Sequence, residues 1–180
     1  MAISIDELVQ RNATFAAGGT FADLTFPTNQ TLRVIGCVDS RVDPSHVLGL
    51  ELGDAVVMRN IGGRVTPAAL RSWAMLAKLG QAHSGGQSDG GPPHMVILHH
   101  TDCGIKRLAA YPELLAEYFE IPVADLETKM VSDPHAAVRI DVGIVRRTLP
   151  PGLLVSGLVY DTDTGLIEVV VPPATPEQLV

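Results

Sequence analysis

The clearest indication of how this chain folds is the stretch Leu32-Arg33-Val34-Ile35-Gly36-Cys37-Val38-Asp39-Ser40-Arg41. It opens with a mostly apolar run that lacks the alternation of apolar and polar side chains shown by a half-exposed strand. A run of this kind is typical of a strand that is covered on both faces, as in a parallel sheet. We therefore expect a buried strand at residues 32–38 that leads into a group of charged and polar side chains.

Four other segments read as strands, and helical patterns lie between most of them. The strand-like runs are Ala55–Arg59, Met95–His100, Leu153–Tyr160 and Leu166–Val171. A short polar turn separates the last two, which predicts an antiparallel hairpin. The helical patterns are Ile3–Ala17, Asp43–Leu48, Ala68–Leu79, Lys106–Phe119 and Pro134–Arg147. This alternation predicts an α/β fold: a mostly parallel central sheet of about four strands plus an antiparallel C-terminal strand, flanked by helices.

Several local signals mark the expected ends of the helices. Asp43-Pro44 and Thr66-Pro67 each combine a capping residue with a proline that suits the first helical position, and Asp133 caps the last helix. Gly80 is expected to close the third helix. The stretch Ser84–Pro93, SGGQSDGGPP, is expected to be a flexible surface loop.

The composition bounds the class of protein. With 180 residues, 46% hydrophobic and 18% charged, the chain suits a single globular domain over residues 1–180. No apolar run reaches the roughly 18 residues that a membrane-spanning helix needs. The N-terminus, MAISIDELVQ, lacks the basic region and apolar core of a signal peptide, so we expect a cytoplasmic protein. The net charge of −7, with only the short basic pairs Lys106-Arg107 and Arg146-Arg147, argues against a nucleic-acid partner.

Two of the predicted strands end in side chains that can bind a metal or act on a substrate. Cys37, Asp39 and Arg41 lie at the end of the first strand, and His99-His100-Thr101-Asp102-Cys103-Gly104 lies at the end of the strand that begins at Met95. Functional sites of open parallel sheets form beyond the carboxyl ends of strands, so these side chains can converge. The two cysteines alone would fit buried apolar residues, a metal pair or reactive thiols, since a cytosolic protein rarely keeps a disulfide.

Cys37, His100 and Cys103 together form a zinc-type donor set. The His-x-x-Cys spacing can place an imidazole and a thiolate on one ion, and Cys37 supplies a second sulfur from the neighbouring strand end. Zinc takes four ligands in a tetrahedron, and three protein ligands with one open position are expected of catalytic zinc. The fourth position can hold water or Asp39. Zinc would lower the pKa of that water to roughly 7, which makes hydroxide available near neutral pH.

Asp39 and Arg41 alternate along an extended segment and can therefore project from the same side. Arg41 would hold Asp39 ionised and away from the metal. Asp39 would then accept a hydrogen bond from the bound hydroxide and orient it toward the substrate. An ordinary surface ion pair is the alternative interpretation.

Other polar residues near the site have structural interpretations. His99 should point to the opposite side of its strand from His100, which favours a core or interface histidine. Asp102 is interpreted as a turn residue or a hydrogen-bond acceptor. Surface positions are expected for His46, His83, His94 and His135.

The same residues carry a resemblance to a known family. Cys37-Val38-Asp39-Ser40-Arg41-Val42, Gly53-Asp54-Ala55, Arg59-Asn60-Ile61-Gly62-Gly63 and His100-Thr101-Asp102-Cys103-Gly104 together resemble the β-class carbonic anhydrases, in their compact branch. The resemblance implies a zinc enzyme that interconverts carbon dioxide and bicarbonate by attack of zinc-bound hydroxide.

The resemblance also implies roles for individual residues. Zinc would lie on the two cysteines and His100, and Asp39 with Arg41 would form a catalytic dyad. In such enzymes the aspartate can swing onto the zinc and close the site. The backbone N–H of Gly104 would lie near the bound substrate.

The family is built on dimers, so the resemblance implies a homodimer or a dimer-based oligomer. Residues 1–19 would form a helical arm that embraces the partner. Two other functions remain open at this point. Some compact relatives hydrolyse carbonyl sulfide or carbon disulfide on the same zinc. A non-catalytic zinc or redox-sensing protein would instead fill the fourth position with a protein ligand.

Overall fold

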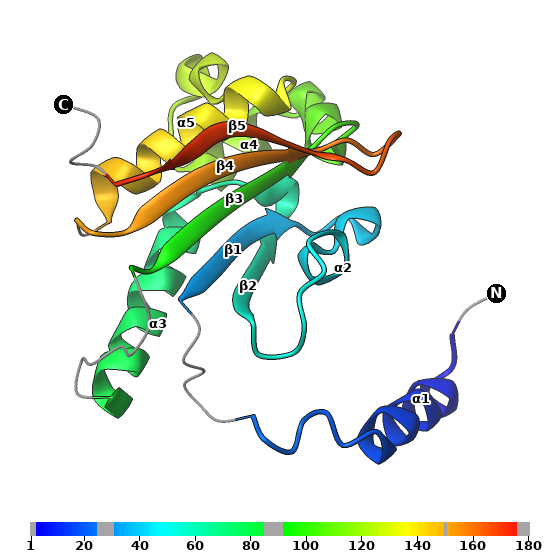
Figure 1. Cartoon of the computed structure of the whole chain (residues 1–180). Coiled ribbons are helices and arrows are strands. Elements are labelled where there is room, and N and C mark those ends of the chain that lie inside the picture. Colours follow the sequence, from blue (N-terminus) through cyan, green and yellow to red (C-terminus); the bar gives the residue numbers. More distant parts are fainter. Residues whose placement is uncertain (1–2, 25–30, 85–91, 150, 176–180) are drawn as a thin grey trace.

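The computed structural model describes residues 3–24, 31–84, 92–149 and 151–175, so most of the predicted loop at residues 84–93 lies outside it. Within these ranges, five strands form one sheet in the order β2-β1-β3-β4-β5 (Figure 1). The strands are β1 (Leu32–Cys37), β2 (Ala55–Asn60), β3 (His94–His100), β4 (Leu154–Tyr160) and β5 (Ile167–Ala174). All neighbours pair in parallel except β4 and β5, which are antiparallel. The predicted α/β fold and C-terminal hairpin are therefore confirmed.

The helical segments of the described residues include both α-helices and 3-10 turns. The α-helices are α1 (Ile5–Ala17), α2 (Pro44–Val47), α3 (Pro67–Ser84), α4 (Pro112–Phe119) and α5 (Pro134–Thr148). The 3-10 segments are η1 (Ser40–Val42), η2 (Ile61–Gly63), η3 (Gly104–Ala110) and η4 (Val123–Lys129). Among the described residues, none of these helices has the length and apolar character needed to cross a membrane.

The register of the three neighbouring strands brings their carboxyl ends to one edge of the sheet. Cys37 at the end of β1 pairs with Asn60 at the end of β2, and Gly36 pairs with Leu98 near the end of β3. The side chains that follow these strands therefore start from neighbouring points, as expected of an open parallel sheet.

The two faces of the sheet are covered by different elements. Successive strand residues point to opposite faces, and the core divides accordingly. On one face, Ile35 packs in a cluster with Trp73 of α3 and Val138 of α5. On the other face, Val34 belongs to a cluster with Val47 of α2. Both strand residues are fully buried, so the unbroken apolar run of β1 reflects cover on both sides.

The predicted helix starts are confirmed by their caps. The Asp43 side chain accepts a hydrogen bond from the Ser45 backbone N–H over 2.9 Å. Thr66 Oγ1 accepts one from the Ala69 N–H over 3.2 Å. The Asp133 side chain accepts two backbone N–H groups at the start of α5. Each cap satisfies a backbone donor that has no partner within its helix.

Two predicted helix boundaries are wrong. Residues 106–119 do not form one helix, because η3 ends at Ala110 and α4 begins at Pro112. Proline lacks the N–H needed to continue a helix and drives the preceding residue out of helical geometry. Tyr111 accordingly has φ −128° and ψ 66°. Gly80 does not close α3, which continues to Ser84, since a single interior glycine costs only about 1 kcal/mol.

The segment η2 runs against the backbone at the ends of β1 and β3. Gly63 has a φ of 64°, a conformation that L side chains rarely adopt. A Cβ atom on Gly63 would lie 2.9 Å from the Leu98 carbonyl oxygen and 3.0 Å from the Cys37 backbone nitrogen. Since both neighbours are backbone atoms, only glycine allows this close approach.

We expect Gly63→Ala to lower the free energy of unfolding by about 2 kcal/mol or more. Alanine is strained in the left-handed backbone conformation of this position, and its Cβ atom would also displace the ends of two strands. Urea denaturation measures the loss. Gly49→Ala is the matched control, since Gly49 has a φ of 65° but open space at its Cβ position; its expected loss is about 1 kcal/mol. Equal losses in the two variants would contradict the role of close packing at Gly63.

Candidate metal centre

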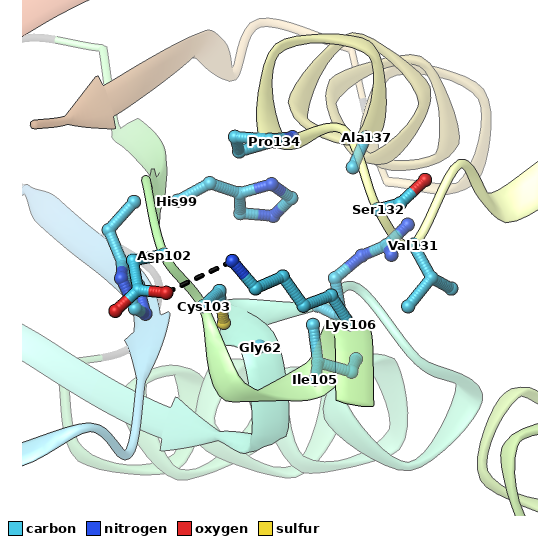
Figure 2. A pocket seen from close by; sticks show the side chains of 12 residues that line it. Gly62, His99, Asp102, Cys103, Ile105, Lys106, Val131, Ser132, Pro134 and Ala137 are labelled. Carbon is cyan, nitrogen blue, oxygen red and sulfur yellow. Dashed lines mark hydrogen bonds and ion pairs between the residues drawn. The ribbon is translucent and has the colours of Figure 1, made fainter. Parts of the chain in front are cut away.

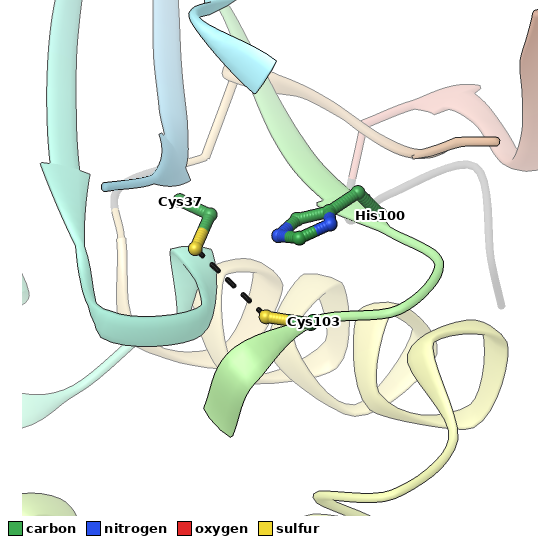
Figure 3. A group of neighbouring side chains, drawn as sticks. All are labelled: Cys37, His100 and Cys103. Carbon is green, nitrogen blue, oxygen red and sulfur yellow. Dashed lines mark hydrogen bonds between the residues drawn. The ribbon is translucent and has the colours of Figure 1, made fainter. Parts of the chain in front are cut away.

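Cys37, His100 and Cys103 lie together at the carboxyl edge of the sheet (Figure 3). Cys37 ends β1, His100 ends β3, and Cys103 follows in the turn before η3. The possible ligand atoms of the three residues all lie within 4.8 Å of one another. The two sulfur atoms are 3.8 Å apart. The convergence expected from the strand ends is therefore present in the fold.

The orientation of His100 leaves one ring nitrogen available. Nδ1 lies 2.7 Å from the carbonyl oxygen of Thr101, to which it can only donate. In the neutral ring this places the proton on Nδ1 and leaves a lone pair on Nε2. Nε2 is buried and has no hydrogen-bond partner. A buried acceptor without a partner is unfavourable, and a metal ion bound at Nε2 would satisfy it.

The two thiols shift each other's pKa in opposite directions. The hydrogen bond from Cys103 lowers the pKa of the Cys37 thiol to about 4, although burial opposes the shift. The same contact, together with burial, raises the pKa of Cys103. Two thiols this close cannot both ionise easily unless a cation lies between them. Two sulfurs and one imidazole nitrogen form a donor set that zinc accepts, so these residues fit a zinc ion.

Asp39 is held by Arg41. The guanidinium donates to both carboxylate oxygens, from Nη2 to Oδ2 over 2.8 Å and from Nε to Oδ1 over 3.1 Å. The Arg41 backbone N–H also donates to Oδ1, which caps η1. These bonds lower the pKa of Asp39 to about 2. Asp39 is therefore ionised at neutral pH, and it lies outside the group formed by the two cysteines and His100.

Asp102 extends this ion pair, a contact that the sequence did not reveal. It accepts Arg41 Nη1 over 3.2 Å and Lys106 Nζ over 3.0 Å. Its φ of 48° places it in the left-handed region of a turn. The interpretation of Asp102 as a turn residue and acceptor agrees with these contacts. Gly104 starts η3 directly after Cys103, and the space at its Cβ position is open.

Arg59, which belongs to one of the motifs quoted from the sequence but was given no role there, lies near the end of β2. Its Nε donates to the Cys37 carbonyl oxygen over 2.9 Å, and its Nη2 donates to the Asp39 carbonyl oxygen over 2.8 Å. It also pairs with the Asp43 carboxylate. Arg59 therefore braces the backbone that carries Cys37 and Asp39.

A small cavity of about 60 Å³ lies on the α5 side of the candidate metal-binding residues (Figure 2). It is lined by His99, His100 and Cys103 together with residues of η3 and the start of α5. His99 is only 2% exposed, which confirms its prediction as a core histidine. His94 is half-buried and contacts Ser156 Oγ, so its predicted surface position is wrong.

We expect Arg41→Met to raise the pKa of Asp39 from about 2 toward its ordinary value, because the main hydrogen bonds to the carboxylate are lost. In the parent, this pair stabilises the fold at neutral pH and the contribution is lost as pH falls toward the lowered pKa. A carbon-13 NMR titration of the carboxyl group measures the shift. Lys106→Met, which removes a partner of Asp102 only, should leave the Asp39 titration in place. An unchanged Asp39 pKa in Arg41→Met would contradict this assignment.

Comparison with known proteins gives a consistent family of relatives. A family profile described as carbonic anhydrase matches residues 32–121. Beta-carbonic anhydrase 1 of Mycobacterium tuberculosis is 32% identical over 100 residues, which cover 56% of this chain and 55% of that protein. A carbon disulfide hydrolase of Acidianus is 34% identical over 93 residues, covering 52% of this chain and 40% of that protein. This chain thus aligns with 55% or less of these curated relatives' length.

Solved structures match over a longer range. A carbonic anhydrase from Streptococcus mutans superimposes with a TM-score of 0.69 and 30% identity, covering 94% of this chain and 99% of that one. A carbonic anhydrase from Glaciozyma antarctica gives a TM-score of 0.64 and 25% identity, covering 94% and 100%. The similarity therefore extends over nearly the whole chain.

Proposed function

Since this chain belongs to the β-class carbonic anhydrase family, we propose that it holds one zinc ion on Cys37, His100 and Cys103 and catalyses the reversible hydration of carbon dioxide to bicarbonate. The observation that carries the proposal is the buried, unpartnered Nε2 of His100 beside two sulfur atoms that are 3.8 Å apart. This arrangement supplies three protein donors, the number expected of a catalytic zinc site.

Zinc, when bound, would act as a Lewis acid that makes hydroxide available from water near neutral pH. The side chains of this site would prepare for that role. Two thiolates and a neutral imidazole balance the charge of the ion, and the Thr101 carbonyl oxygen keeps the His100 ring in the correct tautomer. Thiols that must stay reduced suit a cytoplasmic protein, which is the location we propose.

Asp39 and Arg41 would act on the reacting water. Arg41 occupies both oxygens of Asp39 and keeps the carboxylate ionised. Asp39 would accept a hydrogen bond from the water and direct its lone pair toward the carbon of the substrate. The backbone N–H of Gly104 would orient a substrate oxygen. The released proton would leave to buffer.

Two substitutions test the site. Cys37→Ala should lose both zinc and activity, because it removes one of three donors. Asp39→Asn should retain zinc but lose about 100-fold or more in turnover, because an amide cannot take the role of the carboxylate. Elemental analysis measures the zinc content, and stopped-flow measurement of carbon dioxide hydration gives the rate.

Asp125→Asn is the matched control for the carboxylate, since Asp125 is exposed and lies in η4. It should hydrate carbon dioxide at the parental rate. If purified parent carries no stoichiometric zinc, the proposed metal site is wrong. If Asp39→Asn turns over as fast as the parent, the role given to Asp39 is wrong.

A second substrate class is favoured by the 34% identity to a carbon disulfide hydrolase. Carbonyl sulfide and carbon disulfide are linear molecules that the same site could attack. Side-by-side rates decide between the classes: hydrogen sulfide release that is more efficient than carbon dioxide hydration would reassign the substrate. A non-catalytic zinc protein is disfavoured, because the described residues bring only three His, Cys or carboxylate side chains together here.

We further propose a homodimer in which residues 1–180 form one domain and residues 1–19 form an arm on the partner. The support is α1, which lies away from the sheet (Figure 1) and buries none of its residues. Ile5 is 73% exposed and Val9 is 64% exposed. An isolated helix of this length is marginally stable in water. Its apolar face would therefore gain stability by packing on a second copy.

Leu8→Glu should weaken the dimer, because it places a charge on the apolar face of α1. Sedimentation velocity at several protein concentrations measures the change as a larger monomer fraction. Gln10→Glu adds the same charge to the opposite side of the helix and should leave the dimer intact. Parental sedimentation of Leu8→Glu at every concentration would contradict a role of the arm in assembly.

A further inference from the structure

A buried group of ionisable side chains lies beside the candidate metal centre and has no role in the proposed mechanism. Arg64, which follows η2, is 1% exposed; His99 of β3 is 2% exposed; Asp141 of α5 is fully buried. Removing such groups from water costs several kcal/mol per ion unless the contacts are very good. We therefore expect the contacts within this group to hold neighbouring elements in place.

Asp141 is the centre of the group. Its Oδ2 accepts Arg64 Nε over 2.7 Å and the Val65 backbone N–H over 3.1 Å. Its Oδ1 accepts Arg64 Nη2 over 3.2 Å. Nε2 of His99 lies 3.2 Å from Oδ2, without a well-aligned hydrogen bond. Burial alone would raise the pKa of Asp141, but the contacts with His99 and Arg64 outweigh it and lower the pKa.

One contact of Asp141 reaches the strand that carries His100. His99 and His100 are consecutive in β3, so their side chains point to opposite faces of the sheet. A rotation of the strand end that moved His99 would therefore also move His100. The contact between His99 and Asp141 resists this rotation from the α5 side.

The other contacts of Asp141 are with the loop that packs against the strand carrying Cys37. Arg64 and Val65 follow η2, and Asn60 closes the same loop through bonds to the Arg64 backbone of 2.7 and 2.8 Å. Within the loop, Gly63 lies directly against the Cys37 backbone nitrogen and the Leu98 carbonyl oxygen. Asp141 thereby holds the loop that packs against both strand ends.

We infer that Asp141 is a positioning residue of the metal centre, which acts through His99 and Arg64 to set the place of His100 Nε2 relative to the sulfurs of Cys37 and Cys103. The inference rests on the proposed zinc site. The affinity and geometry of the metal site would then depend on Asp141, His99 and Arg64, which contribute no ligand atom.

The first test is His99→Leu, which removes the ring nitrogen facing Asp141 and keeps an apolar side chain of similar size. Cobalt(II) is the probe, because its visible absorption reports tetrahedral coordination by thiolates, whereas zinc gives no such signal. The variant should bind cobalt about tenfold more weakly, at the lower end of the effect known for groups that orient metal ligands. Its absorption bands should also shift. His99→Gln restores a donor toward Asp141 and should return both the affinity and the spectrum toward those of the parent.

The control is His94→Leu. His94 lies at the opposite end of the same strand and contacts Ser156 Oγ over 2.9 Å. This substitution also removes a histidine contact from β3, but it lies far from the ligand-bearing end. It should leave the cobalt affinity and spectrum unchanged, even if the thermal midpoint falls.

A second variant separates positioning from stability. Asp141→Asn alone would leave Arg64 buried without its counter-charge. The variant is therefore a double one, Arg64→Met with Asp141→Leu, which replaces the ion pair by apolar side chains of similar volume. Such a replacement is often neutral for stability. The double variant should fold and yet bind cobalt about tenfold more weakly. Parental affinity and spectrum in both His99→Leu and the double variant would overturn the inference while leaving the proposed function intact. Absence of metal binding by the parent would overturn both.

Discussion

The parallel pairing of β1 with β3 is the constraint on which the rest of this structure depends. It runs from Leu32 opposite His94 to Gly36 opposite Leu98 and aligns the carboxyl ends of the two strands. Cys37 comes from one end, and His100 and Cys103 come from the other. A shift of one residue in either strand would turn its side chains to the other face. The buried pattern of Val34 and Ile35 resists such a shift, so the packing of the core also sets the geometry of the site.

Charge is compensated in two different ways around the three converging residues. On the open side, Asp39, Arg41, Asp102 and Lys106 form a chain of alternating charges. Arg41 is half-exposed there, so solvent screens its interactions and its partners can exchange. On the α5 side, Arg64 and Asp141 are almost completely buried, and their bonds are not screened. The α5 side of the candidate site is therefore held by buried, unscreened contacts, and the solvent-facing side is held by exposed, screened ones.

The sequence predicted those features that depend on local pattern. The apolar run before Cys37, the caps at Asp43 and Asp133, and the hairpin turn all carry their signals within a few neighbouring residues. The convergence of the two cysteines with His100 could also be predicted, because parallel strands share one carboxyl edge. The break of the helix before Pro112 could also have been predicted from the sequence, because the residue preceding a proline is driven out of helical geometry.

Other features could not be read from the sequence. Arg64 and Asp141 are 77 positions apart, and an aspartate in an amphipathic helix is normally interpreted as solvent-facing. The contact between Arg41 and Asp102 spans 61 positions and depends on a turn at which a non-glycine residue adopts a positive φ. Such contacts follow from tertiary packing, and neither partner carries a local signal of the other.

The separation of the two sulfur atoms along the chain has a consequence for the order of events during folding. Cys37 and Cys103 are 66 positions apart, whereas His100 and Cys103 are near neighbours. An unfolded chain can thus offer an ion only the nearby imidazole and thiol as a preformed pair. Cys37, the third donor, comes close to the other two only after the long chain segment between Cys37 and Cys103 has closed into a loop. Loop closure of this kind is slow in chains rich in distant contacts. Ion capture would therefore complete the folding reaction, and its rate would be limited by assembly of the sheet.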